Sequence, residues 1–409
     1  MTAKSLTPPI FYTIFLLVLI QIFYAKSFAF TQELITQLLE QHMKDFASLE
    51  HQTLGDQVNL LFYDNNNPEK LLHLPNKLIL TYGQIMLLAG DIFGDPEHPI
   101  SSCPVAKRKE CFNLQFNALA GDNDKNNCQN PRDQAQNILQ YHEQIEQLLT
   151  EWRLQGKTDL EFYKEYGSII NKKLNRLTCG GSFINDYIPF GIYLKLSAVN
   201  FDHFQPDSLI AYEIGHQVAL DTALLAYQQR INGNSTNAEQ LLELAYAQNA
   251  FASHFLSDSF ASGHIRTPRR ELEKQVKLPS ILNLLLANLM HDEDNRLGLN
   301  VVNEEGTAWT VYGDNYLFIK EAELQRIILV HAMQRSANSI YETFESGTYP
   351  EFFSELKLVP LFGKVEQLNQ TSPLFKVENN ILLKRKDNHN PYDYEWTDKW
   401  SGLITLLKF

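Results

Sequence analysis

Residues 252–264 read ASHFLSDSFASGH. His254 and Asp258 are four residues apart, so on a helix their side chains leave the same face about one turn apart. Zinc binds imidazole nitrogen and carboxylate oxygen at about 2.0–2.2 Å, and this spacing lets both side chains reach one ion. Gly263 can end the helix and let His264 turn back toward a neighbouring ion. A helical His–Asp pair alone is more often a surface or core hydrogen bond, so further ligands are needed.

Other candidate ligands lie at the ends of other predicted helices. His203 lies just before a helix predicted over 207–230, and His291 closes a helix predicted over 279–291. Asp91 follows a third predicted helix. Helical bundles build multi-metal sites from carboxylates and imidazoles on facing helices. The sequence therefore predicts one metal centre inside a bundle, against the alternative that these residues are independent caps and surface groups.

Helical periodicity dominates the chain. Apolar residues recur at helical spacing over 31–46, 78–90, 133–155, 207–230, 238–262, 279–291 and 320–345. The helix that carries the motif is expected to begin at Asn237, a good N-cap, with Gln240 completing a capping box.

Two regions depart from this helical pattern. A polar stretch rich in Asn, Asp and Pro runs from about 95 to 132, and it predicts a disulfide-held insertion that extends to about residue 180. Short segments at 374–377 and 381–384 are separated by turn residues and predict strands. We therefore predict a mainly α, multi-helix domain over 30–345 and a small β-containing C-terminal appendage over 346–409.

The first 29 residues have the pattern of a cleaved secretory signal. Lys4 precedes an apolar run over 10–24, and Ser27 and Ala29 offer small side chains at the two positions that a signal peptidase reads. The run is shorter than the roughly 20 residues that a membrane span needs. We expect a secreted or periplasmic protein that begins at Phe30, with an uncleaved anchor as the alternative; its final destination after export stays open.

The chain is acidic, with 35 Lys and Arg against 48 Asp and Glu and a net charge of −13. Removal of the predicted signal takes away Lys4 and Lys26 and no acid, which leaves 33 basic residues and a charge of −15. A protein that binds nucleic acid usually has a basic field, so we expect no nucleic-acid partner. No obligate protein partner is evident either.

All four cysteines fall in one stretch, at Cys103, Cys111, Cys128 and Cys179. Disulfides persist in exported proteins, so we expect two of them. The simplest of the three connectivities is Cys103–Cys111 with Cys128–Cys179. A zinc knuckle is the alternative, although paired C-x-x-C elements are missing.

The metal-ligand pattern resembles that of the bacterial zinc-dependent phospholipases C, which share a fold with zinc-dependent nucleases of fungi and plants. The resemblance is strongest over about 202–314, recurs at 81–100, and is closest to the branch with a longer chain and a C-terminal extension. Its most specific element is H-x-x-x-D-x-x-x-x-x-H. The matching residues are His254, Asp258 and His264 in that element, His203 in H-F-x-P-D, Asp91, and His291.

The resemblance implies two or three zinc ions per chain in a phospholipase C-like helical bundle. The first zinc would take Asp91, His203, His254 and Asp258. The second would take His264, His291 and an acid. The family has Glu four residues after that second histidine, where this chain has Asn295; we choose Asp294, with Asp292 and Glu293 as alternatives.

The third zinc site of the family departs further in this chain. Family members use the amino group of the mature N-terminus and an early histidine, bridged by the residue that matches Asp258. Here Phe30 and Gln32 stand at those places, and His42 could substitute only if the helix is set differently.

Several polar residues near the motif have two interpretations each. Arg266, Arg269 and Arg270 either hold a substrate phosphate, which guanidinium groups suit, or form a solvated basic turn. Asp314 lines the pocket or caps a turn, and His216 is expected to be a core histidine.

The resemblance implies a phospholipase C that acts at a phospholipid membrane surface and releases diacylglycerol and a phosphorylated head group. Asp91 would be the catalytic residue, orienting or deprotonating the attacking water. A zinc-dependent single-strand nuclease of the same fold and a non-catalytic binding protein are the alternatives. The preferred head group and the oligomeric state stay open.

Overall fold

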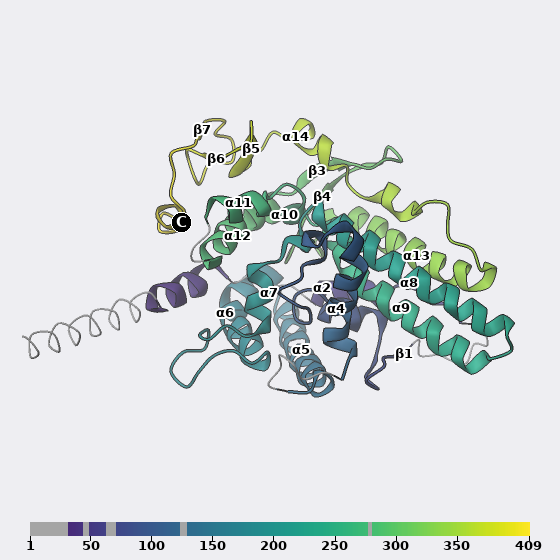
Figure 1. The fold of residues 1–409 in the computed structure, drawn as a ribbon. Coiled ribbons are helices and arrows are strands. Elements are labelled where there is room, and N and C mark those ends of the chain that lie inside the picture. The colour runs from purple at the N-terminus through teal and green to yellow at the C-terminus, as the bar shows by residue number, and fades with distance from the viewer. Residues whose placement is uncertain (1–31, 44–48, 63–70, 123–128, 277–279) are drawn as a thin grey trace, which may run out of the picture.

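The computed structural model describes residues 32–43, 49–62, 71–122, 129–276 and 280–409 (Figure 1). The predicted signal peptide, the predicted N-terminus at Phe30 and the cysteine at position 128 lie outside these residues. The fold is mainly helical with a small C-terminal strand appendage, as predicted. None of the helices described is long and apolar enough to cross a membrane.

Residues 32–42 are helical. The α-helices that follow within the described ranges are α2 (Leu49–Gly55), α3 (Tyr82–Leu88), α4 (Arg108–Ala120), α5 (Pro131–Leu154), α6 (Asp159–Leu177), α7 (Ile192–Ala198), α8 (Asp207–Ile231), α9 (Ser235–Asp258), α10 (Ser262–Ile265), α11 (Arg269–Gln275), α12 (Ser280–Leu297), α13 (Glu323–Ser346), α14 (Val365–Leu368) and α15 (Gly402–Leu406). The strands pair antiparallel as β1 (Leu72–His73) with β2 (Ile79–Leu80), β3 (Leu299–Val302) with β4 (Ala308–Val311), and β5 (Phe375–Glu378) with β6 (Ile381–Arg385) and β7 (Trp396–Thr397).

Helix α9 is the centre of the fold. It packs along α8, α13, α3 and α2, and Figure 1 shows α8, α9 and α13 as long neighbouring helices. Every residue from 245 to 260 is buried, so the end of α9 that carries the motif is surrounded by protein. Gly215 on α8 permits this packing, because a Cβ there would lie 2.7 Å from the Cβ of Ala252 and 2.3 Å from the ring of Phe112.

The helix boundaries differ from the predicted ones at several places. Helix α9 begins at Ser235, because Asn234, rather than Asn237, caps it and accepts a hydrogen bond from the backbone of Asn237. Helix α3 begins only at Tyr82, since residues 79–80 pair in a strand and Thr81 forms the capping box.

Three further features of the structure differ from the predicted pattern. The polar stretch near residue 100 contains helix α4, whose buried face includes Phe112 and Phe116. Helix α6 was not predicted, although Thr158 and Glu161 form a capping box at its start. Helix α12 continues to Leu297, so His291 lies inside the helix rather than at its end.

The C-terminal appendage is fixed to α12 by buried polar contacts. Arg385 of β6 is fully buried and donates two hydrogen bonds, at 2.8 and 2.7 Å, to the carboxylate of Glu293. The amide of Phe375 contacts the sulfur of Met290 at 3.4 Å, and the ring of Phe375 packs on that of Trp400. The appendage is therefore anchored close to His291.

One of the two predicted disulfides is confirmed. Cys103 and Cys111 are bonded to each other. Cys179 is also in a disulfide, and its expected partner lies outside the described residues.

Candidate metal centre

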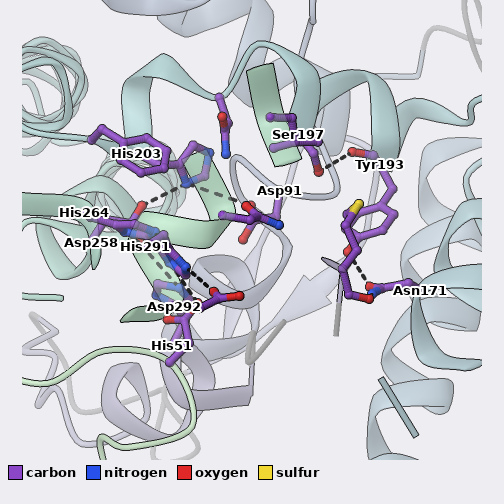
Figure 2. A pocket seen from close by; sticks show the side chains of 16 residues that line it. His51, Asp91, Asn171, Tyr193, Ser197, His203, Asp258, His264, His291 and Asp292 are labelled. Atoms are coloured by element: carbon purple, nitrogen blue, oxygen red, sulfur yellow. Dashed lines mark hydrogen bonds and ion pairs between the residues drawn. The ribbon is translucent and has the colours of Figure 1, made fainter. Parts of the chain in front are cut away.

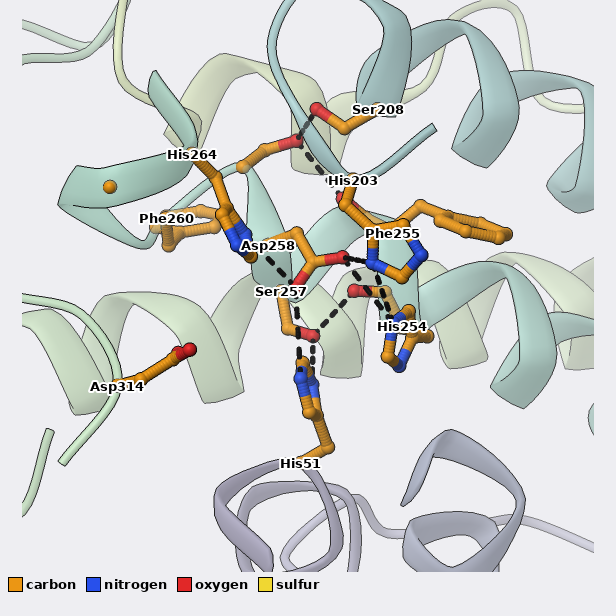
Figure 3. A network of polar contacts seen from close by, with 12 residues as sticks. His51, His203, Ser208, His254, Phe255, Ser257, Asp258, Phe260, His264 and Asp314 are labelled. Atoms are coloured by element: carbon orange, nitrogen blue, oxygen red, sulfur yellow. Dashed lines mark hydrogen bonds and ion pairs between the residues drawn. The ribbon is translucent and has the colours of Figure 1, made fainter. Parts of the chain in front are cut away.

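Three side chains predicted to share one ion do converge. The Oδ2 atom of Asp258 lies 2.9 Å from Nδ1 of His203 and 3.4 Å from Nε2 of His254, and the two nitrogens are 3.1 Å apart (Figure 3). Ligands bound tetrahedrally to zinc at about 2.0–2.1 Å stand about 3.3 Å from one another. The three atoms therefore have the spacing of ligands around a single ion.

Asp91 completes this first group. Its carboxylate oxygens lie 3.8 Å from Nδ1 of His203 and 3.7 Å from Nε2 of His254. The approach depends on Gly90, which has a φ of 69° and whose Cβ, if present, would lie 2.9 Å from His203 and 3.0 Å from His254. A side chain at this turn would push Asp91 away from the two imidazoles.

The second carboxylate oxygen of Asp258 faces a different set of side chains. Its Oδ1 lies 3.3 Å from Nδ1 of His264 and 3.6 Å from Nε2 of His51 (Figure 3). The ring of His51 stacks on that of His254, with centroids 4.3 Å apart. Asp258 thus lies between two groups of imidazoles, as a bridging carboxylate does.

A second ligand group contains His264, His291 and Asp314. The Nε2 atoms of the two histidines are 3.1 Å apart, and Oδ2 of Asp314 lies 3.5 Å from Nε2 of His291. Figure 2 shows His264, His291, His203 and Asp91 around one pocket.

The hydrogen bonds behind the histidines direct their lone pairs into the cluster. Nδ1 of His254 donates to the carbonyl of Met86 at 2.9 Å, so in the neutral ring the Nε2 that faces Asp91 and Asp258 carries the lone pair. Nδ1 of His291 lies 2.8 Å from the carboxylate of Asp292, which leaves its Nε2 in the same state. Such outer partners are typical of metal-bound histidine.

A hydrogen bond to Nδ1 also orients the ring of His51. The hydroxyl of Ser257 donates its proton to the carbonyl of His254 at 2.7 Å, so its oxygen accepts from Nδ1 of His51 at 2.8 Å. The lone pair of Nε2 then faces the carboxylate of Asp258. A cation between this lone pair and the carboxylate would stabilise the arrangement.

His51 is a candidate ligand that the sequence did not indicate. The early histidine in the cluster is His51 on α2 rather than His42. Its partner Asp258 lies more than 200 residues further along the chain. No motif surrounds His51, and only the packing of α2 against α3 and α9 brings it to the site.

The acid of the second group is Asp314, and Asp294 has a different role. Asp294 is fully buried and accepts hydrogen bonds from Nε and Nη2 of Arg266 at 2.9 and 2.7 Å. Asn295, at the place of the family's Glu, accepts a hydrogen bond from the backbone of Gly263 at 2.7 Å and so holds the segment of His264. Of the alternatives, Asp292 lies behind His291, and Glu293 pairs with Arg385.

The arginines after His264 are held by the protein itself. Arg269 is buried and donates to Asn200, Asn283 and the carbonyl of Ala198. Arg270 pairs with Asp207 and with the serines at 101 and 102.

Arg266, Arg269 and Arg270 are not among the residues that line the metal pocket, so the structure does not bring the predicted phosphate ligands to it. His216 lies in the core, as predicted, where it contacts Asn249 and Ser339.

The titrating groups of the cluster perturb one another strongly. Burial raises the pKa of Asp91 to about 7, against the charge of His203. Burial would lower the pKa of His203, but the carboxylates of Asp91 and Asp258 raise it to about 9. Burial also opposes the charge of Asp258, yet the imidazoles of His254, His264 and His203 hold its pKa well below the usual range. Metal binding would displace these shared protons.

The pocket is lined by groups that bind metal rather than phosphate. Its lining histidines and aspartates are His51, His203, His264, His291, Asp91, Asp258, Asp292 and Asp314. Among the described residues that form the walls there is neither a lysine nor an arginine. Four carboxylates with no lysine or arginine beside them disfavour an anion, and bound cations would offset this charge for a phosphate.

One further group of possible ligands lies apart from this pocket. Asp95, Glu97 and His98 bring their ligand atoms together at the surface, and two of the three side chains are exposed. Exposed acidic groups of this kind are common without an ion, so we assign it no role.

Comparisons with protein-family models, with curated proteins and with solved structures find no match for this chain. The resemblance to the zinc-dependent phospholipases C therefore rests on the residues themselves and stays a prediction.

Proposed function

We propose that the chain is a zinc-dependent phosphodiesterase of the phospholipase C type. The observation that carries the proposal is the position of Asp258, whose two carboxylate oxygens face two separate sets of imidazoles. The lone pairs of His51, His254 and His291 are all directed into this cluster by hydrogen bonds on the opposite side of each ring. Such a ligand set fits two or more zinc ions with Asp258 as their bridge.

The chemistry follows from the charges in the pocket. The two ligand groups would hold zinc ions, whose charge would neutralise a phosphodiester and lower the pKa of a bound water. Asp91 would orient the attacking water toward phosphorus. The polar side chains of Ser197 and Asn200 line the same pocket, whereas the amide of Asn171 is bonded to Met43 and Tyr193.

Two observations favour a phospholipid over a nucleic acid as the diester. The chain carries a net charge of −13, which repels a polyanion and leaves a single diester as the better substrate. Met43, Phe204 and Leu284 give the pocket an apolar wall that suits the glycerol end of a lipid. Cleavage on the glycerol side releases diacylglycerol and a phosphorylated head group.

Product analysis tests the proposal. Zinc-loaded protein is incubated with mixed phospholipids and, separately, with single-stranded DNA, and Asp258→Asn is compared with the surface variant Asp221→Asn. We expect diacylglycerol from the wild type and from Asp221→Asn, and none from Asp258→Asn. Digestion of DNA with intact lipids would show a nuclease. Zinc binding with neither product would show the non-catalytic binding protein.

A further inference from the structure

A second pocket lies on the C-terminal appendage and has the opposite character to the metal pocket. Four lysines and a single aspartate are its charged lining residues: Lys384, Lys386, Lys399, Lys408 and Asp387. Lys386 pairs with Glu395 at 2.9 Å, which partly neutralises it. Among the residues that the structure describes, the other three lysines form no ion pair. An acidic chain therefore has a local basic site here.

Lys384 is the unusual member of this lysine pocket. Its side chain is buried, and its ammonium group donates to the backbone carbonyl of Arg385 at 2.6 Å and to the amide oxygen of Asn388 at 2.5 Å. Burial and the charges of Lys408 and Arg385 lower the pKa of Lys384. A buried cation normally has an anionic partner. Asp387 lines the same pocket and its charge opposes this shift, but among the described residues no carboxylate forms an ion pair with Lys384. An anionic ligand would supply that partner.

Apolar side chains flank the same pocket. Ile404 of α15 lines it and is 55% exposed, and Leu407, next to Lys408, is 63% exposed. The indole of Trp400 forms part of the wall. Lysines beside exposed aliphatic and aromatic groups are typical of surfaces that rest in the head-group region of a bilayer.

The lysine pocket is connected to the metal centre. Asp292 and Asp314 line both the metal pocket and a groove beside it. Asn388 and His389 line that groove and also the lysine pocket. The three hollows therefore adjoin one another, and in Figure 1 the appendage stands beside α12, which carries His291.

We propose that the lysine pocket binds the head group of an anionic phospholipid in a membrane and so places the metal pocket at the bilayer surface. The binding half of this proposal stands on the lysines and their apolar neighbours. The positioning half rests on the proposed function.

Vesicle binding tests the first half. Vesicles of phosphatidylcholine, with or without added phosphatidylglycerol, are sedimented with zinc-loaded protein in an Asp91→Asn background, so that the lipid is not consumed. The test variant is Lys399→Gln with Lys408→Gln, because both side chains are exposed and the fold should tolerate the change. The control, Lys107→Gln with Lys173→Gln, removes the same charge from two exposed lysines elsewhere.

We expect the parent to prefer the anionic vesicles, and the test variant to bind them roughly 25-fold more weakly, at about fivefold for each lysine. The control variant should bind as the parent does, and added salt should weaken the parent's binding. Equal loss in both variants, or no preference for anionic lipid, would overturn the proposal. So would binding of inorganic phosphate or single-stranded DNA through these lysines without vesicle binding.

Hydrolysis of a short-chain, water-soluble phosphatidylcholine separates the two proposals. The lysine variant, in an otherwise wild-type chain, should cleave this substrate at the wild-type rate but should lose activity on anionic vesicles. A wild type that binds anionic vesicles without cleaving the soluble lipid would reject the proposed function and leave the head-group site standing. Equal loss on both substrates would reject a positioning role for the lysines.

Discussion

The variant Asp294→Asn should be less stable than the wild type but should still bind its metal. The guanidinium of Arg266 has a side-chain exposure of 3% and makes two hydrogen bonds to Asp294. Removal of one partner of a buried ion pair costs about 3–5 kcal/mol, because the other charge stays buried. Thr371 and the exposed Glu366, 3.6 Å away, still contact Arg266, so we expect the lower end, about 3 kcal/mol.

The matched variant, Asp314→Asn, should lose metal but keep its stability. The side chain of Asp314 is 23% exposed and faces His291, and no buried cation depends on it. We expect it to lose the zinc of the second group while the metal-free protein keeps nearly the wild-type stability.

Two measurements on the wild type, Asp294→Asn and Asp314→Asn decide between these roles. Urea denaturation in chelator gives the free energy of unfolding without the contribution of metal binding. Elemental analysis after zinc reconstitution gives the metal count. If folded Asp294→Asn loses zinc and Asp314→Asn retains all of it, then Asp294 is the ligand and our reading of the site is wrong.

Three further variants test the fold and the chemistry. Gly215→Ala should cost about 1–3 kcal/mol in chemical denaturation, because its Cβ would lie 2.7 Å from that of Ala252; an unchanged midpoint would argue against the close packing of α8 on α9. Burial lowers the pKa of His142 from 6.5 to about 4. The unfolded chain therefore takes up a proton below pH 6.5 that the folded chain refuses, and stability present above pH 6.5 is lost as the pH falls toward 4. In metal-free protein, His142→Leu should remove about 3 kcal/mol of that loss. If the free energy of unfolding of the variant depends on pH as that of the wild type does, the prediction is wrong. Asp91→Asn should lower diester hydrolysis by about 10²–10⁴-fold with most of the zinc retained if Asp91 acts on water; parallel loss of zinc would make it chiefly a ligand.

The candidate ligands that stand close together in the sequence could be predicted. The four-residue spacing of His254 and Asp258 is read directly from a helix, and His264 follows within one short turn. His203, Asp91 and His291 stand near long periodic segments, so their helices could be located.

The remaining ligands depend on contacts that the local sequence does not encode. His51 lies on a helix of seven residues and reaches Asp258 only through tertiary packing. Asp314 comes to His291 because the hairpin of β3 and β4 returns the chain beside α10, where the amide of Ser262 contacts the carbonyl of Tyr312 at 3.4 Å. Asp294 was chosen for its distance from His291 along the chain, whereas the position of Arg266 decides its role.

The most direct test of the metal centre is the number of zinc ions per chain in the wild type and in Asp258→Asn. Both are measured in a His98→Gln background, which removes the separate surface group of ligands. We predict at least two equivalents in the parent after reconstitution and dialysis, and a loss of at least one equivalent in Asp258→Asn. Less than one equivalent in the parent, or an unchanged count in Asp258→Asn, would contradict a zinc cluster bridged by Asp258.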